Sequence, residues 1–353
     1  MTAWPTLAAL QLRIDSYAVD RLARWFAYGM ERVTTLVRLQ GAGEEGQGED
    51  VSVVPNAEDE ANTLHEMERT LPLTGEWTLG DFCAHLRTVE QWDEEPQWEP
   101  MKRWRNWAFE SAALDLALHQ AGAPLHDVVE REPKPVRFVN SLGLGDPPTF
   151  DPIARRLADH PALRFKVDAV PAWSAELVEQ VAATGAVEIV DFKGRYGLEV
   201  EDEAALVAMY ERVIEAFPDA LLEDGHELPA CLSLLERQAG RISYDAPIHG
   251  KDDLDTLPVA PTALNIKPCR VGDLESLLDL YEETEARGLI TYGGGMGELA
   301  VGRDQIQLLA SLFHPDGPND TAPSGYNAET PAPDLPASPL DPKPAPTGFR
   351  RAA

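Results

Sequence analysis

The sequence predicts an α/β fold in which an α+β domain precedes a barrel of alternating strands and helices. From about Pro135, short apolar segments alternate with amphipathic helical segments in units of roughly 20 to 30 residues, the rhythm of a parallel βα barrel. Before Pro135, strand-like alternation gives way to a longer, helical periodicity. The 353 residues are enough for one large barrel and a smaller domain.

The first domain is predicted to span residues 1–134. Residues 10–51 begin with apolar alternation, pass through a more helical stretch, and end in the strand-like residues 34–40 and a glycine-rich segment, which together indicate a hairpin. Residues 107–121 are rich in alanine and leucine and predict a helix. Gly122 and Pro124 follow it, as is usual at a helix end.

The barrel is predicted over residues 135–314. Its strand candidates are 136–142, 163–168, 187–191, 220–223, 242–245, 264–267 and 289–292. Helical stretches between them include 174–183, 203–216, 229–238 and 273–287. Residues 315–353 are rich in proline, alanine and aspartate, so we expect a tail that is partly disordered or lies along the surface.

Composition excludes several classes of protein. A formal charge of -30 repels nucleic acid and anionic lipid, and no apolar run approaches the roughly 20 residues that span a bilayer. The N-terminus lacks the pattern of a secretion signal, so a cytoplasmic location is expected. Three widely spaced cysteines argue against a disulfide framework and against a structural zinc site.

Charged residues stand at the ends of five consecutive strand candidates: Lys166, Asp191, Glu223, Asp245 and Lys267. Because the C-terminal strand ends of a βα barrel share one mouth, the three carboxylates should converge. Alone, each acid is more often a solvated loop charge or a helix cap. Together they would repel one another unless a hard divalent cation bound them, and Mg²⁺ fits, with Mn²⁺ possible.

The two lysines flank the carboxylates. Lys166 and Lys267 would face each other across the metal, one on each side of a bound substrate, which suits proton removal from one face and delivery to either. A metal and nearby cations stabilise the enediolate that forms when a proton next to a carboxylate leaves. A lysine base also needs its pKa lowered from about 10.4, by desolvation or neighbouring positive charge.

Several stretches, in their order and spacing, resemble the enolase superfamily and, within it, the muconate lactonizing enzyme subgroup. They are VRLQGAGEEGQGE, WAFESAALDLALHQAG, LRFKVD, VEIVDFKG, ALLEDG, RISYDAPI, LNIKPCRVG and YGGGMGE. The resemblance covers about residues 10–313 and implies a capping domain on a modified (β/α)7β TIM barrel, an architecture that often forms homo-oligomers. It implies that Asp191, Glu223 and Asp245 bind the metal, and that Lys166 and Lys267 form the acid/base pair.

The sequence departs from the subgroup at several positions. Arg164 occupies the first position of the Lys-x-Lys motif, and Lys193 replaces the asparagine of Asp-x-Asn. Both are predicted to bind a substrate anion, although Lys193 could instead neutralise Asp191 or Glu223. Glu298, in the loop after the seventh strand, either binds substrate or caps the helix that begins near Val301.

The sequence leaves alternatives for two segments. The closing strand is replaced by HPDGPNDTAP, where Asp316 or Asp320 could stand in for substrate-binding acids. Residues 17–32 lie where the subgroup has a mobile loop that closes over substrate, but they could equally form a helix packed on the barrel.

These observations favour a Mg²⁺-dependent enzyme that removes a proton alpha to a carboxylate of a small molecule through an enediolate intermediate. The paired lysines favour a racemase or epimerase of an amino-acid derivative or dipeptide. A lyase or cycloisomerase similar to o-succinylbenzoate synthase would use the same five residues. A third hypothesis, prompted by Arg164 and Lys193, is a non-catalytic barrel that binds a small acidic ligand.

Overall fold

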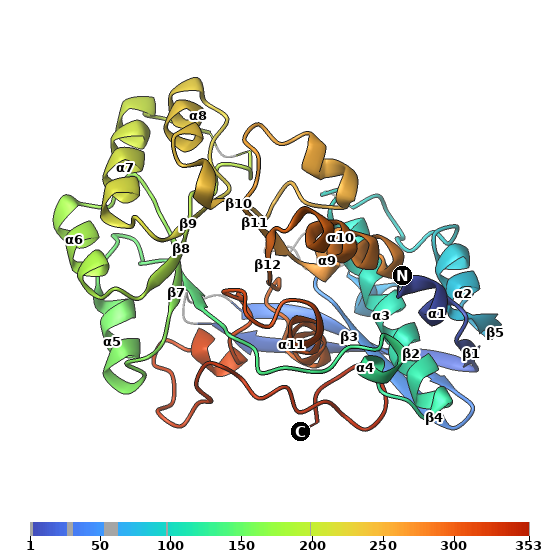
Figure 1. Cartoon of the computed structure of the whole chain (residues 1–353). Helices are drawn as coiled ribbons and strands as arrows, with labels where there is room; N and C mark the ends of the chain where they lie inside the picture. Colours follow the sequence, from blue (N-terminus) through green and yellow to red (C-terminus); the bar gives the residue numbers. More distant parts are fainter. Residues whose placement is uncertain (1–2, 27–30, 53–62, 97, 198, 353) are drawn as a thin grey trace.

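The computed structural model describes residues 3–26, 31–52, 63–96, 98–197 and 199–352. These residues form a curled parallel sheet surrounded by helices, with an antiparallel domain beside it (Figure 1). The predicted fold class, a capping domain on a modified TIM barrel, is confirmed. No helix among the described residues is both long enough and apolar enough to cross a bilayer.

The barrel sheet has seven parallel strands in the order β12-β11-β10-β9-β8-β7-β6. Its strands are β6 (Asn140–Leu142), β7 (Phe165–Asp168), β8 (Val187–Asp191), β9 (Leu221–Glu223), β10 (Ile242–Tyr244), β11 (Ala263–Ile266) and β12 (Ile290–Gly293). Each lies within or overlaps a predicted strand, because short apolar runs mark buried parallel strands.

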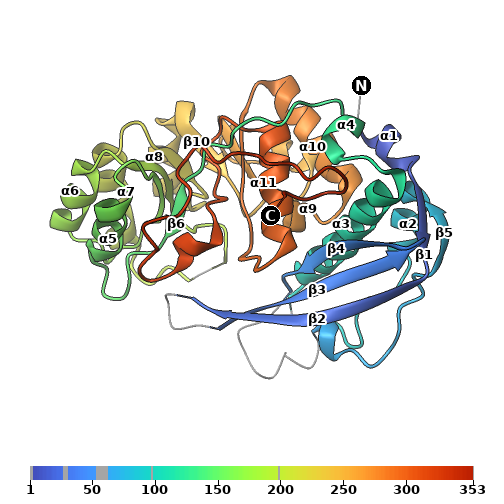
Figure 2. The same ribbon diagram turned by 90° about the horizontal axis from the view of Figure 1, so that it is seen from below.

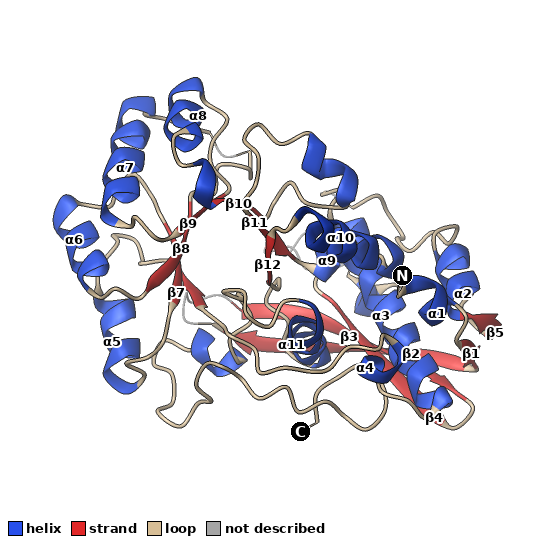
Figure 3. Cartoon of the chain, viewed as in Figure 1, coloured by secondary structure: helices blue, strands red, loops and turns tan. Residues whose placement is uncertain are grey.

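Helices pack on the outside of the strand ring (Figure 3). They are α5 (Asp151–Asp159), α6 (Ala175–Ala183), α7 (Glu203–Ala216), α8 (Pro229–Glu236), α9 (Pro268–Val271), α10 (Leu274–Arg287) and α11 (Val301–Phe313). Several begin at a side-chain cap that the sequence already offers. Ser174, Asp202 and Asp273 each accept a hydrogen bond from the backbone three residues on.

The ring closes between β12 and β6 through an irregular segment. Asn319 bridges to Phe138 and Asp320 bridges to Gly294, both in the parallel direction. The Asn319 side chain accepts the Gly293 N–H at 2.7 Å, where a regular strand would use its backbone. Pro318 has no N–H to donate, so two single bridges replace a full eighth strand.

The cap contains a three-stranded sheet of β2 (Ser16–Trp25), β3 (Glu31–Gly41) and β4 (Glu44–Asp50). A second pair joins β1 (Gln11–Ile14) to β5 (Gly75–Thr78), and the cap helices are α1 (Trp4–Ala8), α2 (Leu79–Leu86), α3 (Met101–Ala121) and α4 (Leu125–Val128). Figure 2 shows the β2–β3 ribbon reaching beneath the barrel.

The helix considered for residues 17–32 is wrong for the part that the structure describes. Residues 17–25 form strand β2, which pairs along its whole length with β3. Cross-strand pairing decides the conformation here, because it overrides a weak helical pattern. Residues 27–30 lie outside the described residues.

The glycine-rich segment after β3 serves helix packing as well as the turn. The turn itself is made by Ala42 and Gly43, whose φ angles are 51° and 84°. Gly46 and Gly48 lie in β4 against α3, and a Cβ at Gly48 would come within 2.0 Å of the Ala108 carbonyl oxygen. Glycine therefore lets the sheet backbone touch the helix backbone.

The C-terminal residues 315–352 pack against both domains. Phe349 is fully buried and its ring lies edge-on to Trp107, 6.4 Å between centroids. The buried Asp115 accepts the Phe349 N–H at 2.6 Å and forms an ion pair with Arg350. The described part of this segment is thus anchored to the cap helix, while the domain division at residues 134 and 314 stays a prediction.

Glu110 joins the cap helix α3 to the barrel helix α10. It is fully buried and accepts hydrogen bonds from the Leu274 N–H at 2.8 Å and the Asn106 amide at 3.1 Å. Burial raises the pKa of Glu110 to about 7, and these hydrogen bonds offset the effect only in part.

The native state therefore holds this proton more tightly than the unfolded chain does. Stability from this group is present below the unfolded pKa and is lost as pH rises from about 4 through about 7. We expect Glu110→Gln to remove this loss, so that the variant gains about 3 kcal/mol relative to the parent chain between pH 4 and pH 8. Urea unfolding across this range measures it.

The exposed Glu179→Gln on α6 is the matched control and should follow the parent chain at every pH. Parallel stability curves for Glu110→Gln and the parent would contradict the assignment.

Gly48→Ala should destabilise the cap by at least about 2 kcal/mol, because the methyl group has no room beside the Ala108 carbonyl. Gly240→Ala is the control, since a Cβ there meets nothing within 4 Å. Thermal unfolding compares the two, and equal melting temperatures would show that the helix and sheet can separate without penalty.

Candidate active site

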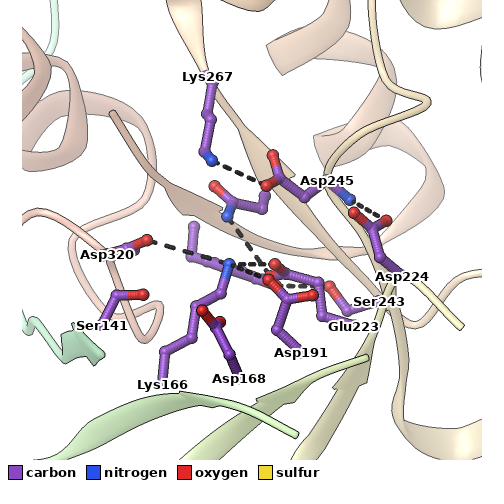
Figure 4. A network of polar contacts seen from close by, with 12 residues as sticks. Ser141, Lys166, Asp168, Asp191, Glu223, Asp224, Ser243, Asp245, Lys267 and Asp320 are labelled. Carbon is purple, nitrogen blue, oxygen red and sulfur yellow. Dashed lines mark hydrogen bonds and ion pairs between the residues drawn. The ribbon is translucent and has the colours of Figure 1, made fainter. Parts of the chain in front are cut away.

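The structure brings the five predicted charged residues together at the C-terminal mouth of the barrel. Lys166 lies in β7, while Asp191 and Glu223 are the last residues of β8 and β9. Asp245 and Lys267 directly follow β10 and β11. All five are buried, and the two lysines approach the carboxylates from opposite sides (Figure 4).

The carboxylates divide into two groups. Oxygen atoms of Asp191, Glu223 and Asp224 lie within 4.8 Å of one another. Asp245, the predicted third ligand, instead forms ion pairs with Lys267, at 2.8 Å, and with Arg270. Arg270, which lies in α9, therefore holds Asp245 beside the group formed by Asp191, Glu223 and Asp224.

Asp224 organises the turn that follows β9. Its two carboxylate oxygens accept the backbone N–H groups of Asp245 and Ala246, each at 2.9 Å. Its φ angle of 50° is unusual for a residue with a side chain, and such strain persists where surrounding contacts fix it. Asp224 thus sets the position of Asp245.

Lysines supply the countercharge for the first group. Lys166 Nζ hydrogen-bonds to Glu223 and lies 3.2 Å from an Asp191 oxygen. Lys193 follows β8 with a φ of 54°, and its ammonium pairs with Asp191 and lies 3.2 Å from Asp168. Lys193 therefore neutralises Asp191, and because it also lines the cavity, its predicted contact with a substrate anion stays a prediction.

The pKa values follow from burial set against these ion pairs. Burial disfavours the charged form of Lys166, yet Glu223 and Asp191 together hold its pKa well above the usual range. Burial also opposes ionisation of Asp191 and Asp245, but lysine and arginine partners bring the pKa of both below normal. Burial and neighbouring carboxylates raise the pKa of Asp224 to about 6.

A cavity of about 340 Å³ opens beside this cluster. Its charged lining residues are Lys166, Asp168, Lys193, Lys267, Arg303 and Asp320. Phe26 from the cap and Gly295 and Gly297 from the loop after β12 also line it. Four cations and two carboxylates thus face a space of the size of a small metabolite.

The structure does not bring Arg164 to this cavity. Arg164 precedes β7, so it lies at the opposite end of the barrel, where its guanidinium bonds to the carbonyls of Ala162 and Leu163. There it lines a larger hollow of about 750 Å³, which also contains Asp316. Arg164 and Asp316 are thus separated from the charged cluster, whereas Asp320 faces it.

Glu298 neither lines the cavity nor caps α11. It is buried, accepts the Met296 N–H at 2.8 Å, and lies 3.6 Å from Arg303. Glu49 of the cap occupies the capping position instead, accepting the N–H groups of Leu299, Ala300 and Gly302 at 2.6 to 3.1 Å.

The cap also fixes the loop after β12. Arg32 of β3 donates hydrogen bonds to the carbonyls of Met296, at 2.8 Å, and Gly297, at 3.3 Å. Together with Glu49, it ties the glycine loop that lines the cavity to the capping sheet. The cavity is therefore shaped by both domains.

The donor set is suited to a hard divalent cation. Asp191, Glu223 and Asp224 offer buried carboxylate oxygens, the ligands that Mg²⁺ prefers. The side-chain oxygen of Asn265 is also buried and has no hydrogen-bond partner among the described residues. A cation held here would compete with the ammonium groups that now contact the same carboxylates.

Sequence reasoning missed three contributors. Arg270 lies three residues after Lys267, the N-cap residue of α9, a spacing that could have indicated a shared partner. Asp224 stands next to Glu223, so the acid pair was visible, but its backbone contacts were not. Asp168, two residues after Lys166 in β7, shares its face of the strand.

Comparisons with solved structures agree with this architecture. Muconate cycloisomerase from Pseudomonas fluorescens is 19% identical, covers 88% of this chain and 87% of its own, and has a TM-score of 0.63. A dipeptide epimerase from Methylococcus capsulatus, solved in complex with a Mg ion, is 20% identical with the same TM-score and coverage of 87% and 89%.

Curated relatives carry related names. An o-succinylbenzoate synthase from Geobacillus kaustophilus is 28% identical over 236 residues, which span 62% of this chain and only 59% of that relative. An N-succinylamino acid racemase from Thermus thermophilus is 26% identical over 333 residues, 87% of this chain and 83% of the relative.

Fold and relatives together define a member of the enolase superfamily, in its muconate lactonizing enzyme subgroup, as the sequence motifs predicted. Family models described as the N-terminal and C-terminal domains of DUF8230, a domain of unknown function, match residues 5–128 and 132–328. The chain belongs to this DUF8230 family.

Proposed function

We propose that the chain is a metal-dependent enzyme that removes a proton alpha to the carboxylate of a small molecule and returns a proton to the same carbon. The carrying observation is the placement of Lys166 and Lys267 on opposite sides of the carboxylate cluster, both lining one cavity. A racemase or epimerase needs such a pair, because the proton leaves one face and arrives at the other.

The metal, Mg²⁺ with Mn²⁺ as a substitute, would be held by Asp191 and Glu223, with Asp224 or Asp245 beside them. When bound, it supplies a Lewis acid that stabilises negative charge on the substrate carboxylate. One lysine, as the neutral amine, would accept the alpha proton and become an ammonium group, and the opposite lysine, starting protonated, would give its proton to the other face of the same carbon. The two lysines exchange roles for the opposite enantiomer.

The remaining cations of the cavity suit anion binding. Lys193 and Arg303 both line the cavity, and an arginine guanidinium pairs well with carboxylates. The presence of these two cations in the cavity lining supports a carboxylate substrate.

A lyase is the second candidate. Two curated relatives from Geobacillus are named o-succinylbenzoate synthase, although the matched region spans only 59% of each. In that reaction class one lysine removes the proton and the other mainly stabilises charge. A binding protein without catalysis is the outcome if neither chemistry is found.

The test is deuterium exchange at the alpha carbon, followed by NMR in deuterium oxide with Mg²⁺ and pools of N-acylamino acids, dipeptides and other carboxylates. We expect exchange by the parent protein and its loss on chelation. Lys166→Ala and Lys267→Ala should each slow exchange by about 10²-fold or more, with single enantiomers affected unequally.

Arg164→Gln is the matched control, because the structure places Arg164 at the far end of the barrel, and it should exchange like the parent. Elimination of water from a substrate in place of exchange would select the lyase. Binding of Mg²⁺ with neither exchange nor elimination across these pools would overturn both enzyme proposals.

A further inference from the structure

We propose that Lys166 is a built-in competitor for the metal, holding Asp191 and Glu223 when no metal is bound and turning toward Asp320 when a divalent cation binds them. The proposal rests on the proposed function in one respect, that these carboxylates take up a divalent cation. It adds that metal uptake releases Lys166 into the cavity where it would meet substrate.

The ammonium group of Lys166 lies between two of the clustered carboxylates. Lys166 Nζ contacts Glu223 and lies 3.2 Å from Asp191 Oδ2, and its side chain is 1% exposed. It therefore fills the space between two of the three clustered carboxylates. A divalent cation bound to both would lie next to this positive charge, and repulsion at such distances is strong in a buried site.

The ammonium group of Lys166 has another partner within reach. Asp320 Oδ2 lies 4.0 Å from Lys166 Nζ, and Figure 4 shows it on the side away from Asp191 and Glu223. Both Lys166 and Asp320 line the 340 Å³ cavity. A flexible lysine side chain can move between the two by rotation about its own bonds, with no backbone change.

The other cations of the site are placed differently. Lys193 contacts Asp191, but it also has Asp168 at 3.2 Å and its side chain is 33% exposed. Lys267 and Arg270 are paired with Asp245. Lys166 is thus the cation whose contacts join Asp191 to Glu223, and its departure is what opens the pair to a metal.

The probe is Mn²⁺, a paramagnetic substitute for Mg²⁺, whose binding to the whole chain is measured by electron paramagnetic resonance and calorimetry. Lys166→Met removes the competitor and should tighten Mn²⁺ binding by about tenfold or more. Asp320→Asn removes the alternative partner, so Lys166 stays on the carboxylates and binding should weaken by about threefold or more.

Lys251→Met is the control for loss of charge alone. Lys251 pairs with Asp279 at 2.7 Å on the surface, outside the cavity lining, so its removal should change Mn²⁺ affinity less than twofold. Without metal, Lys166→Met leaves carboxylates uncompensated and should melt at a lower temperature, with a larger rise on adding Mn²⁺ than in the parent chain. If this variant does not fold, Asp320→Asn decides alone.

Equal or weaker Mn²⁺ binding by a folded Lys166→Met, or unchanged binding by Asp320→Asn, overturns the proposal while the metal-dependent function stands. If Mn²⁺ binds neither the parent nor Lys166→Met, both the competition by Lys166 and the metal-dependent function are overturned. Binding by Lys166→Met alone would support the competition in its strongest form.

Discussion

Four carboxylates with no exposure to solvent, those of Asp191, Glu223, Asp224 and Asp245, share one end of the barrel, and each must be compensated. Lys166, Lys193, Lys267 and Arg270 supply four positive charges in direct contact, while backbone N–H groups satisfy Asp224. Removing one partner from such a cluster strands a buried charge, which typically destabilises a protein by about 3 to 5 kcal/mol. The mouth of the barrel therefore holds together as one unit.

This requirement extends to parts of the chain that carry no reacting group. The loop that carries Gly295 and Gly297 keeps its shape because Arg32 and Glu49, both from the capping sheet, bind its backbone. The cap sheet in turn packs tightly on α3 because Gly46 and Gly48 have no side chains. Cap packing and cavity shape are thus linked through a short series of hydrogen bonds.

The sequence predicted the barrel strands well, since most are short apolar runs, and five of the seven end in or are directly followed by a charged residue. It also predicted that Lys166, Asp191, Glu223, Asp245 and Lys267 converge, because strand order and parallel direction place such residues at one mouth. Arg164 was predicted to contact substrate but lies at the other end of the barrel, because the spacing of a motif does not show how far along the barrel axis a side chain lies. In a strand two residues span roughly 7 Å, enough to move a side chain to the far end of a short barrel.

Contacts between distant segments were beyond sequence reasoning. Glu49 accepts a hydrogen bond from the N-cap residue Ala300, 251 residues later in the chain, a pairing that no local pattern encodes. The choice of Asp245 for Lys267 and Arg270 depends on the turn set by Asp224. Strand β2 formed where a helical stretch was considered, because its partner β3 lay nearby in space.

The irregular segment that closes the barrel determines where Asp316 and Asp320 lie. A regular eighth strand would continue the backbone ladder, whereas here Asn319 uses its side chain to bond Gly293, and the chain turns at Pro315 and Asp316. That break leaves Asp316 at the far end and directs Asp320 to the mouth. Lys166 therefore has a carboxylate on each side, Glu223 on one and Asp320 on the other. A flexible cation between two anionic partners can occupy two positions. A third charge nearby changes the populations of these two positions.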